Sequence, residues 1–327
     1  MPRELIKNIG EKELIKRLSR YMPANQTSDD CAFLKKSNQD LLINTDLMVE
    51  NTHFNDQLIS PKDIGWKAVI SNISDLISSG CDEILAINIG LVLPSTTEWK
   101  WVDELYTGIS EALSEYGGFI AGGDCANGNT KTICITVFGT QGKLKLRRYA
   151  CKPGEVLLTT GIHGLSKLGF MLLNKSLNDD THLEESLIKD AKQAFCRPKP
   201  NHKILQKIIK SNKDLKPDAF IGCTDSSDGI YQSLLDLANA SNCRAVIDYK
   251  KLPKHELWPN GESWESNYFE GGEDYELIFS LPIQWAKDLM NIDNSISQFG
   301  YLKKGKPSIE LINYPNNNLQ IKSFSHF

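Results

Sequence analysis

The chain carries the stretch Gly271-Gly272-Glu273-Asp274-Tyr275-Glu276-Leu277-Ile278-Phe279. The glycine pair and the acidic residues after it predict a turn, and the apolar residues that follow predict a strand over residues 275–279. The same order recurs upstream, where an expected strand at residues 219–224 runs into Asp225-Ser226-Ser227-Asp228-Gly229, and where residues 119–121 lead into Gly122-Gly123-Asp124. Short apolar or glycine-rich runs therefore lead repeatedly to aspartates.

The remaining pattern mixes helices and strands without a strict alternation. Apolar residues at helical spacing predict helices over residues 4–21, 61–80, 99–116, 165–173, 183–195, 203–212 and 230–240. Short apolar runs bounded by turn residues predict strands over residues 31–34, 41–46, 83–93, 132–139, 156–160 and 219–224. Residues 258–267 and the tail from Asn313 are expected to be rich in loops. This mixture favours α/β domains of the α+β kind over a doubly wound sheet.

The length of 327 residues suits two domains better than one core. The polar string from Arg147 to Gly154 ends in a Pro-Gly turn and is the expected boundary. We therefore expect an N-terminal domain over residues 1–147 and a C-terminal domain over residues 148–327.

Composition excludes several classes of protein. The apolar share of 40% and the charged share of 24% are typical of a folded globular chain. A net charge of −4 without a long basic run argues against nucleic acid as a partner. The charged start lacks the apolar core of a signal peptide, and no stretch approaches the roughly 20 apolar residues of a membrane helix. We expect a cytoplasmic protein without membrane contact.

Acidic residues are the main chemical signal. They stand at Asp29, Asp30, Asp46, Asp124, Asp225 and Asp228. A lone aspartate after a strand is usually a turn or helix cap. Several together suggest a cation site, because buried carboxylates repel each other unless cations neutralise them, and oxygen ligands suit Mg²⁺.

Asp75 falls inside the expected helix 61–80, three residues after Asn72, so the two side chains share a face. That face is either solvated or directed at a metal site, and spacing alone does not decide between these readings.

The common nucleotide motifs are absent from the sequence, since it contains no G-x-x-x-x-G-K-[ST] and no G-x-G-x-x-G. If ATP binds, its phosphates must be held mainly through metal–carboxylate bridges. Gly122-Gly123 would let the backbone approach a phosphate closely. No G-x-S-x-G elbow surrounds Ser227, which argues against a nucleophilic serine.

Taken in order, the motifs resemble the thiamine-monophosphate kinase family over nearly the whole chain from about residue 28. The matching segments are Ser28-Asp29-Asp30-Cys31-Ala32, Asn44-Thr45-Asp46, residues 49–54, Asn72-Ile73-Ser74-Asp75-Leu76, Gly122-Gly123-Asp124, Lys152-Pro153-Gly154-Glu155, Asp225-Ser226-Ser227-Asp228-Gly229 and residues 271–277. The last two segments are the most specific. Departures from the family pattern stand at Ser28, Asn44, Cys125, Ala126-Asn127 and residues 163–166.

The resemblance implies a two-domain fold like that of aminoimidazole ribonucleotide synthetase. The N-terminal domain would bind ATP and Mg²⁺ and dimerise through its sheet, and the C-terminal α/β domain would complete the nucleotide and substrate site. It implies ATP-dependent phosphorylation of thiamine monophosphate to thiamine diphosphate by direct in-line transfer, with several Mg²⁺ ions and a homodimer.

Site residues follow from the same resemblance. Mg²⁺ ligands would be Asp30, Asn44, Thr45, Asp46, Asp75, Asp124, Asp225 and Asp228. The nucleotide would be held by Gly123, Asp124, Arg148, Ser227 and Tyr106, with Arg148 also stabilising charge in the transition state. Thiamine monophosphate would contact His53, Glu273 and Phe324. Two alternatives are another ATP-using member of the superfamily, of the aminoimidazole ribonucleotide synthetase or selenophosphate synthetase type, and a non-catalytic nucleotide or metal sensor.

Overall fold

The computed structural model describes residues 4–23, 38–177, 182–216 and 219–314. The chain divides into two compact units. One comprises Met1–Leu76 and Cys81–Gly142, and the other comprises Ile77–Gly80 and Lys143–Phe327. Among the described residues, none of the helices has the length and apolar character needed to cross a membrane.

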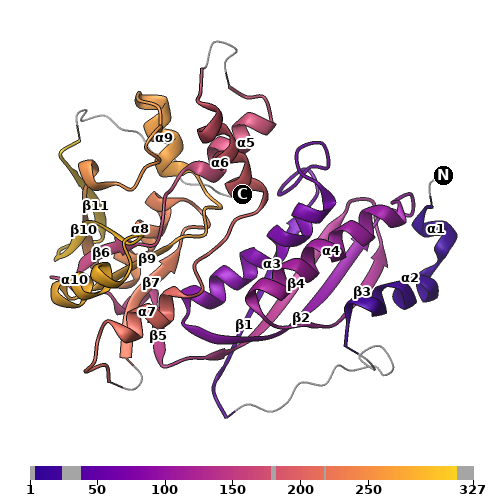
Figure 1. Ribbon diagram of the computed structural model, residues 1–327, viewed down its shortest axis with the longest axis horizontal. Helices are drawn as coiled ribbons and strands as arrows, with labels where there is room; N and C mark the ends of the chain where they lie inside the picture. Colours follow the sequence, from indigo (N-terminus) through magenta and orange to yellow (C-terminus); the bar gives the residue numbers. More distant parts are fainter. Residues whose placement is uncertain (1–3, 24–37, 178–181, 217–218, 315–327) are drawn as a thin grey trace. The chain divides into compact units, whose positions relative to one another are not determined.

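Unit 1 is a four-stranded sheet with helices on one face (Figure 1). Its elements are α1 (Ile6–Ile9), α2 (Glu11–Leu18), η1 (Ser19–Tyr21), β1 (Leu41–Val49), α3 (Pro61–Ser78), β2 (Cys81–Leu93), α4 (Trp99–Tyr116), β3 (Ile120–Asn127) and β4 (Thr132–Gln141). The strand order is β1-β4-β2-β3, so β1 and β3 are the two edges. Only the β2–β3 pair is parallel among these strands.

The helix α4 shows how the sequence sets these elements. Its buried residues include Val102, Leu105, Ile109 and Ala112, which recur at helical spacing and form one apolar face. The helix ends at Gly117, whose φ of 98° is a conformation that a residue with a Cβ rarely adopts. The expected bounds of this helix are therefore confirmed.

Unit 2 is built on a seven-stranded mixed sheet of order β11-β8-β10-β6-β9-β7-β5. Its strands are β5 (Leu144–Arg147), β6 (Val156–Thr159), β7 (Ala219–Asp225), β8 (Cys243–Asp248), β9 (Leu277–Leu281), β10 (Ser297–Lys304) and β11 (Ser308–Ile312). Its helices are η2 (Arg148–Ala150), α5 (Leu165–Leu173), α6 (Glu185–Cys196), α7 (Ile204–Lys210), α8 (Ile230–Ala240), η3 (Tyr249–Lys251), α9 (Glu262–Glu270) and α10 (Ile283–Ile292).

The core of unit 2 joins the sheet to its helices. Leu157, Leu234, Tyr268, Ile278 and Phe299 are all almost completely buried in one apolar cluster. Burying an apolar side chain of this size contributes about 1.5–3 kcal/mol. Two mixed sheets, each carrying helices, confirm the expected α+β class.

Three expectations about local structure are wrong. The expected opening helix is interrupted at Gly10, whose φ is +75°. The segment expected to be loop contains α9, because Tyr268 and Phe269 are drawn into the core. The expected strand at 275–279 begins only at Leu277, because Tyr275 has a φ of +55°. The expected strand at residues 31–34 lies outside the described residues.

Candidate functional site

The first group of expected site residues lies between β1 and α3 of unit 1. The Nδ2 atom of Asn44 donates to Oδ2 of Asp75 at 2.6 Å and lies 3.4 Å from Oδ1 of Asn72. Side chains alternate across a strand, so Asn44 and Asp46 share the face of β1 that α3 covers. This packing brings Asn44, Asp46 and Asp75 together.

The carboxylate of Asp46 is partly buried. Burial raises its pKa, although hydrogen bonds from Ser71 and Asn44 and the nearby His53 act in the opposite direction. Removing a carboxylate from water disfavours its charged form, and a nearby cation would favour that form. Asp46 is therefore a carboxylate that a bound cation would stabilise.

His53 is fixed by a tight turn at the end of β1. Its backbone N–H donates to the carbonyl oxygen of Val49 at 2.8 Å, and the Val49 N–H donates to Nδ1 of His53 at 3.1 Å. Because Nδ1 accepts this bond, the ring carries its proton on Nε2. The turn thus places His53 next to Asp46.

Thr45 points to the opposite face of β1. Its hydroxyl lies 2.9 Å from that of Thr136, its partner in the β1–β4 register. The side chain is thus separated from those of Asn44 and Asp46 by the pleat of the strand. The Thr45 side chain therefore does not reach the α3 side of β1.

Gly123 and Asp124 lie on β3, at the other edge of the sheet. Across the sheet, Asp46 pairs with Ile135, Ile135 with Ile89, and Ile89 with Gly123. Three strand spacings separate Asp46 from Gly123, a distance of roughly 14 Å. Within one chain, Asp124 is therefore apart from the Asn44, Asp46 and Asp75 group.

Glycine is required at position 123 by close packing, and Tyr106 lies nearby in the core. A Cβ on Gly123 would lie 1.9 Å from the carbonyl oxygen of Ile89. Tyr106 is 2% exposed, and both its burial and the neighbouring Cys125 raise the pKa of its hydroxyl. Its ring centroid is 5.5 Å from that of Tyr21. The structure therefore places Tyr106 in the core of unit 1, near Tyr21 and Cys125.

The second group lies in unit 2, in the turn between β7 and α8. Asp225 ends β7 and is 2% exposed, and its backbone carbonyl accepts a hydrogen bond from the Ser233 hydroxyl at 2.9 Å. Ser227 and Asp228 follow, and Asp228 is exposed. Gly229, at a φ of 91°, is the N-cap residue just before α8. This turn holds the two expected ligands Asp225 and Asp228 on one short segment.

Arg148 belongs to the same group. Its Nε donates to the hydroxyl of Thr224 at 3.0 Å, and its guanidinium lies 3.7 Å from Asp236. The side chain is 53% exposed. The hydrogen bond to Thr224 holds the Arg148 side chain in place, and its exposed guanidinium group can still approach a phosphate.

Glu273 is positioned beside Ser227 by its backbone. The Glu273 N–H donates to the Ser227 carbonyl at 2.8 Å, and a Cβ on Gly272 would lie 2.4 Å from that same oxygen. Glu273 has a φ of +66° and Tyr275 a φ of +55°. Such conformations are uncommon for residues with a Cβ, and they concentrate at functional sites.

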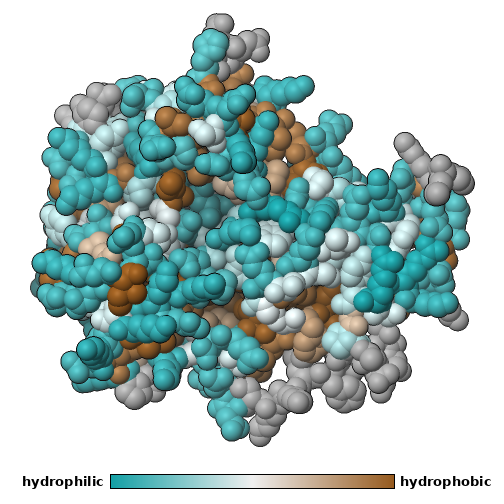
Figure 2. Space-filling view, viewed as in Figure 1, coloured by the Kyte–Doolittle hydropathy of each residue, from teal (hydrophilic) through white to brown (hydrophobic). Residues whose placement is uncertain are grey.

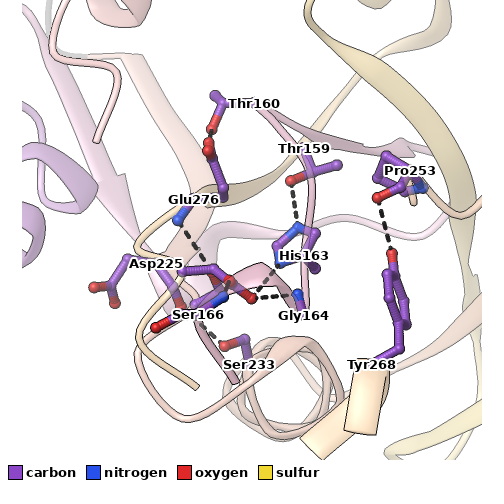
Figure 3. A network of polar contacts seen from close by, with 12 residues as sticks. Thr159, Thr160, His163, Gly164, Ser166, Asp225, Ser233, Pro253, Tyr268 and Glu276 are labelled. Carbon is purple, nitrogen blue, oxygen red and sulfur yellow. Dashed lines mark hydrogen bonds and ion pairs between the residues drawn. The ribbon is translucent and has the colours of Figure 1, made fainter. Parts of the chain in front are cut away.

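A buried polar network stands behind this segment (Figure 3). The carboxylate of Asp274 accepts hydrogen bonds from the backbone N–H of Gly164 at 2.6 Å and of Ser166 at 3.0 Å, at the start of α5. Burial raises the pKa of Asp274 to about 8, whereas the two amide donors act in the opposite direction. His163 lies 4.0 Å away, and burial lowers its pKa to about 3.

Glu276 extends this network toward β6. It accepts a hydrogen bond from the hydroxyl of Thr160, and its own N–H donates to the hydroxyl of Ser226 at 3.0 Å. Burial raises the pKa of Glu276 to about 7. Asp274 and Glu276 are not among the site residues expected from the sequence. Their signal was the pair of acidic residues just before an apolar strand.

Other expected site residues fall elsewhere or outside the described residues. Asp30 and Phe324 belong to the latter. In the part of the chain that the structure describes, no group of three or more His, Cys, Asp or Glu side chains is arranged to hold a metal ion. The carboxylates instead form two groups, one in each unit, together with Asp124 on the edge strand β3.

Comparison with known proteins decides the family. Residues 28–141 match the family model described as AIR synthase related protein, N-terminal domain. A thiamine-monophosphate kinase of Prochlorococcus marinus is 45% identical over 310 residues, which cover 92% of this chain and 91% of that protein. The chain belongs to the thiamine-monophosphate kinase family.

Further relatives of the thiamine-monophosphate kinase family agree with this assignment. The thiamine-monophosphate kinase of Synechococcus elongatus is 31% identical over 308 residues, which cover 94% of this chain and 92% of the relative. The fold matches that of AaThiL complexed with AMPPCP and TMP, with a TM-score of 0.73, 24% identity and 98% of each chain covered. The resemblance expected from the sequence is confirmed, as is the expected fold class.

Proposed function

We propose that this chain transfers the γ-phosphoryl group of ATP to thiamine monophosphate, giving ADP and thiamine diphosphate. The observation that carries this proposal is the 45% identity to the Prochlorococcus marinus kinase across 92% of the chain. The AaThiL structure, which contains AMPPCP and TMP, supports the same pair of substrates.

The proposed reaction does not need a general base. The acceptor is a phosphate oxygen that is already ionised near neutral pH. The residues of the site must therefore align the acceptor with the donor and offset the repulsion between two polyanions. Arg148, fixed at Thr224 and exposed at its tip, is suited to offset charge that develops on the transferring group.

Mg²⁺ fits the donor chemistry of both groups, because carboxylate and amide oxygens are the ligands that this ion prefers. Burial raises the pKa of Asp46, and a cation bound beside it would favour its charged form. The proposed ligands are Asp30, Asn44, Thr45 through its backbone carbonyl, Asp46, Asp75, Asp124, Asp225 and Asp228. When bound, the ions would neutralise phosphate oxygens.

The other expected site residues would contact the nucleotide or thiamine monophosphate. Gly123 and Asp124 would approach the nucleotide from β3, and Tyr106, expected as a further nucleotide contact, is buried in the core of unit 1. Ser227 would contact the nucleotide from the β7–α8 turn. His53, Glu273 and Phe324 would contact thiamine monophosphate. Residues 1–147 would thus supply most of the ATP and Mg²⁺ contacts, and residues 148–327 would complete the site.

We also propose a homodimer formed through the sheet of unit 1. Leu41, Ile43 and Leu47 project from the face of β1 opposite α3 and are 54%, 59% and 56% exposed. Figure 2 shows that apolar side chains reach the surface among mostly hydrophilic ones. An edge strand with an apolar exposed face favours association, and a second copy of this chain would cover it.

Product analysis tests the proposed reaction. The purified chain is incubated with ATP, Mg²⁺ and, in separate tubes, thiamine monophosphate, the acceptor of aminoimidazole ribonucleotide synthetase or the acceptor of selenophosphate synthetase. We expect ADP and thiamine diphosphate in equal amounts in the first tube only. Turnover with either other acceptor would favour the corresponding superfamily activity, and ATP binding without any transfer would favour a sensor.

The stereochemistry of transfer tests the in-line step. With ATP made chiral at the γ-phosphorus, a single direct transfer inverts the configuration. Retention would indicate a phosphoenzyme intermediate and overturn direct transfer.

A further inference from the structure

Residues 271–277 pass between two parts of unit 2 and are held on both sides. On one side the Glu273 N–H donates to the Ser227 carbonyl, and the Glu276 N–H donates to the Ser226 hydroxyl. On the other side Asp274 accepts from the first amides of α5. This segment therefore links the start of α5 to the β7–α8 turn.

The glycines of the segment make this contact close. A Cβ on Gly271 would lie 2.9 Å from Cβ of Lys167 and 3.3 Å from Cα of Gly164. A Cβ on Gly272 would lie 2.4 Å from the Ser227 carbonyl oxygen. Neither glycine can carry a side chain without moving its neighbours, so the path of the backbone before Glu273 is fixed by packing.

The residues on either side of Asp274 are in an unfavourable conformation. Glu273 and Tyr275 both have positive φ, although neither is a glycine. Such residues persist only where the surrounding structure determines them. Asp274 lies between them, and its side chain is 2% exposed. Its two hydrogen bonds are the contacts best placed to hold this backbone.

We propose that Asp274 is a positioning residue for Glu273: by binding the amides of Gly164 and Ser166, it holds the backbone that presents the Glu273 side chain to the acceptor. The inference rests on the proposed function, in which Glu273 contacts thiamine monophosphate. It assigns no contact with substrate to Asp274 itself.

An aspartate suits this role because both of its side-chain oxygens accept hydrogen bonds, and both can still accept when one of them carries a proton. Asparagine has nearly the same shape, but its NH₂ group would face a second N–H donor. In Asp274→Asn one buried amide of α5 therefore loses its acceptor, which is costly for a buried donor. We expect the segment that carries Glu273 to move, because this movement lets the amide that has lost its acceptor find another partner.

The experiment measures KM for thiamine monophosphate and for ATP in Asp274→Asn, Glu273→Gln and the double variant. KM does not depend on how much of the enzyme is folded, so a loss of stability does not obscure the result. We expect Asp274→Asn to raise KM for thiamine monophosphate about tenfold and KM for ATP less than twofold. In the Glu273→Gln background, the same change should raise KM less than twofold further.

Asp293 provides a matched control. It is also a buried aspartate of unit 2, and it accepts from the Ser295 N–H at 3.1 Å and from Lys207 at 2.6 Å. Asp293→Asn should lower stability and leave KM for thiamine monophosphate unchanged. If Asp274→Asn does not accumulate as folded protein, Asp274→Ser, which retains one acceptor, carries the same prediction.

The outcomes distinguish failure of the positioning role from failure of the proposed function. The positioning role is wrong if Asp274→Asn raises KM for thiamine monophosphate by the same factor in the original chain and in the Glu273→Gln background. It is also wrong if Asp293→Asn raises this KM as much as Asp274→Asn does. If Glu273→Gln leaves KM for thiamine monophosphate unchanged, the assignment of Glu273 to the acceptor is wrong. The proposal is supported if the single variants raise KM for thiamine monophosphate about tenfold and the double variant raises it little further.

Discussion

Helices α3 and α4 touch at two glycines, and adding one methyl group there should destabilise unit 1. A Cβ on Gly65 would lie 2.0 Å from the carbonyl oxygen of Leu105, and a Cβ on Gly108 would lie 1.8 Å from that of Lys62. Both obstacles are backbone atoms, so no change of rotamer relieves them. The helices would have to separate by more than about 1 Å to restore ordinary contact.

The sign of the effect depends on two opposing contributions. Replacing glycine by alanine inside a helix gains about 1 kcal/mol from helix propensity. Overpacking costs about 1–3 kcal/mol, and a backbone obstacle places this case at or above the upper end. Gly108→Ala should therefore lower the free energy of unfolding by about 2 kcal/mol. The corresponding fall in Tm is roughly 4–8 °C.

Thermal unfolding followed by circular dichroism measures this change. Gly90→Ala is the control, because a Cβ there first meets Cys134 at 3.4 Å, an ordinary contact. Gly65→Ala with Gly108→Ala should cost less than the sum of the two, since one separation of the helices accommodates both. A raised Tm in Gly108→Ala would refute the reasoning, because propensity would then outweigh packing.

Three further predictions concern the site and the assembly. Asp46→Asn should reduce turnover about 100-fold or more, while stability without Mg²⁺ is kept or rises because the buried charge is gone; full activity would contradict the metal role. The pKa of His163 is about 3 in the folded protein, below its ordinary value, so its contribution to stability is lost as pH falls from about 6.5 toward 3. In His163→Asn the free energy of unfolding, measured with urea, should therefore depend less steeply on pH, by up to about 1.4 kcal/mol per pH unit. An equal slope in the two proteins would contradict a neutral His163. Ile43→Lys should shift the chain toward monomer in analytical ultracentrifugation, whereas Ile15→Lys, at another exposed apolar position of unit 1, should not; an unchanged dimer in Ile43→Lys would exclude this face.

Much of the fold could be predicted from local pattern. The bounds of α4 and α8 follow from apolar residues at helical spacing between glycines or strand ends. The helix α9 could not be predicted, because its residues have weak helical pattern and fold through the burial of Tyr268 and Phe269. Tertiary packing decides that segment.

The candidate site was predictable only in part, for a topological reason. The spacing of Asn72 and Asp75 placed them on one face of α3, and both contact Asn44. The strand order β1-β4-β2-β3, however, puts Asp46 and Asp124 on opposite edges. Strand order depends on crossovers that no local motif specifies.

The buried network around Asp274 was also beyond local pattern. Its partners Gly164 and Ser166 lie about a hundred residues earlier in the chain and reach Asp274 only because α5 packs against residues 271–274. Pairing across such distances is set by the fold, whereas the sequence shows only a glycine pair followed by acidic residues.

A ³¹P NMR time course of ATP, thiamine monophosphate and Mg²⁺ with the purified chain tests the central claim most directly. Thiamine diphosphate and ADP should appear together in equal amounts, and chelation of Mg²⁺ should stop the formation of both. Hydrolysis of ATP with thiamine monophosphate left intact would contradict it.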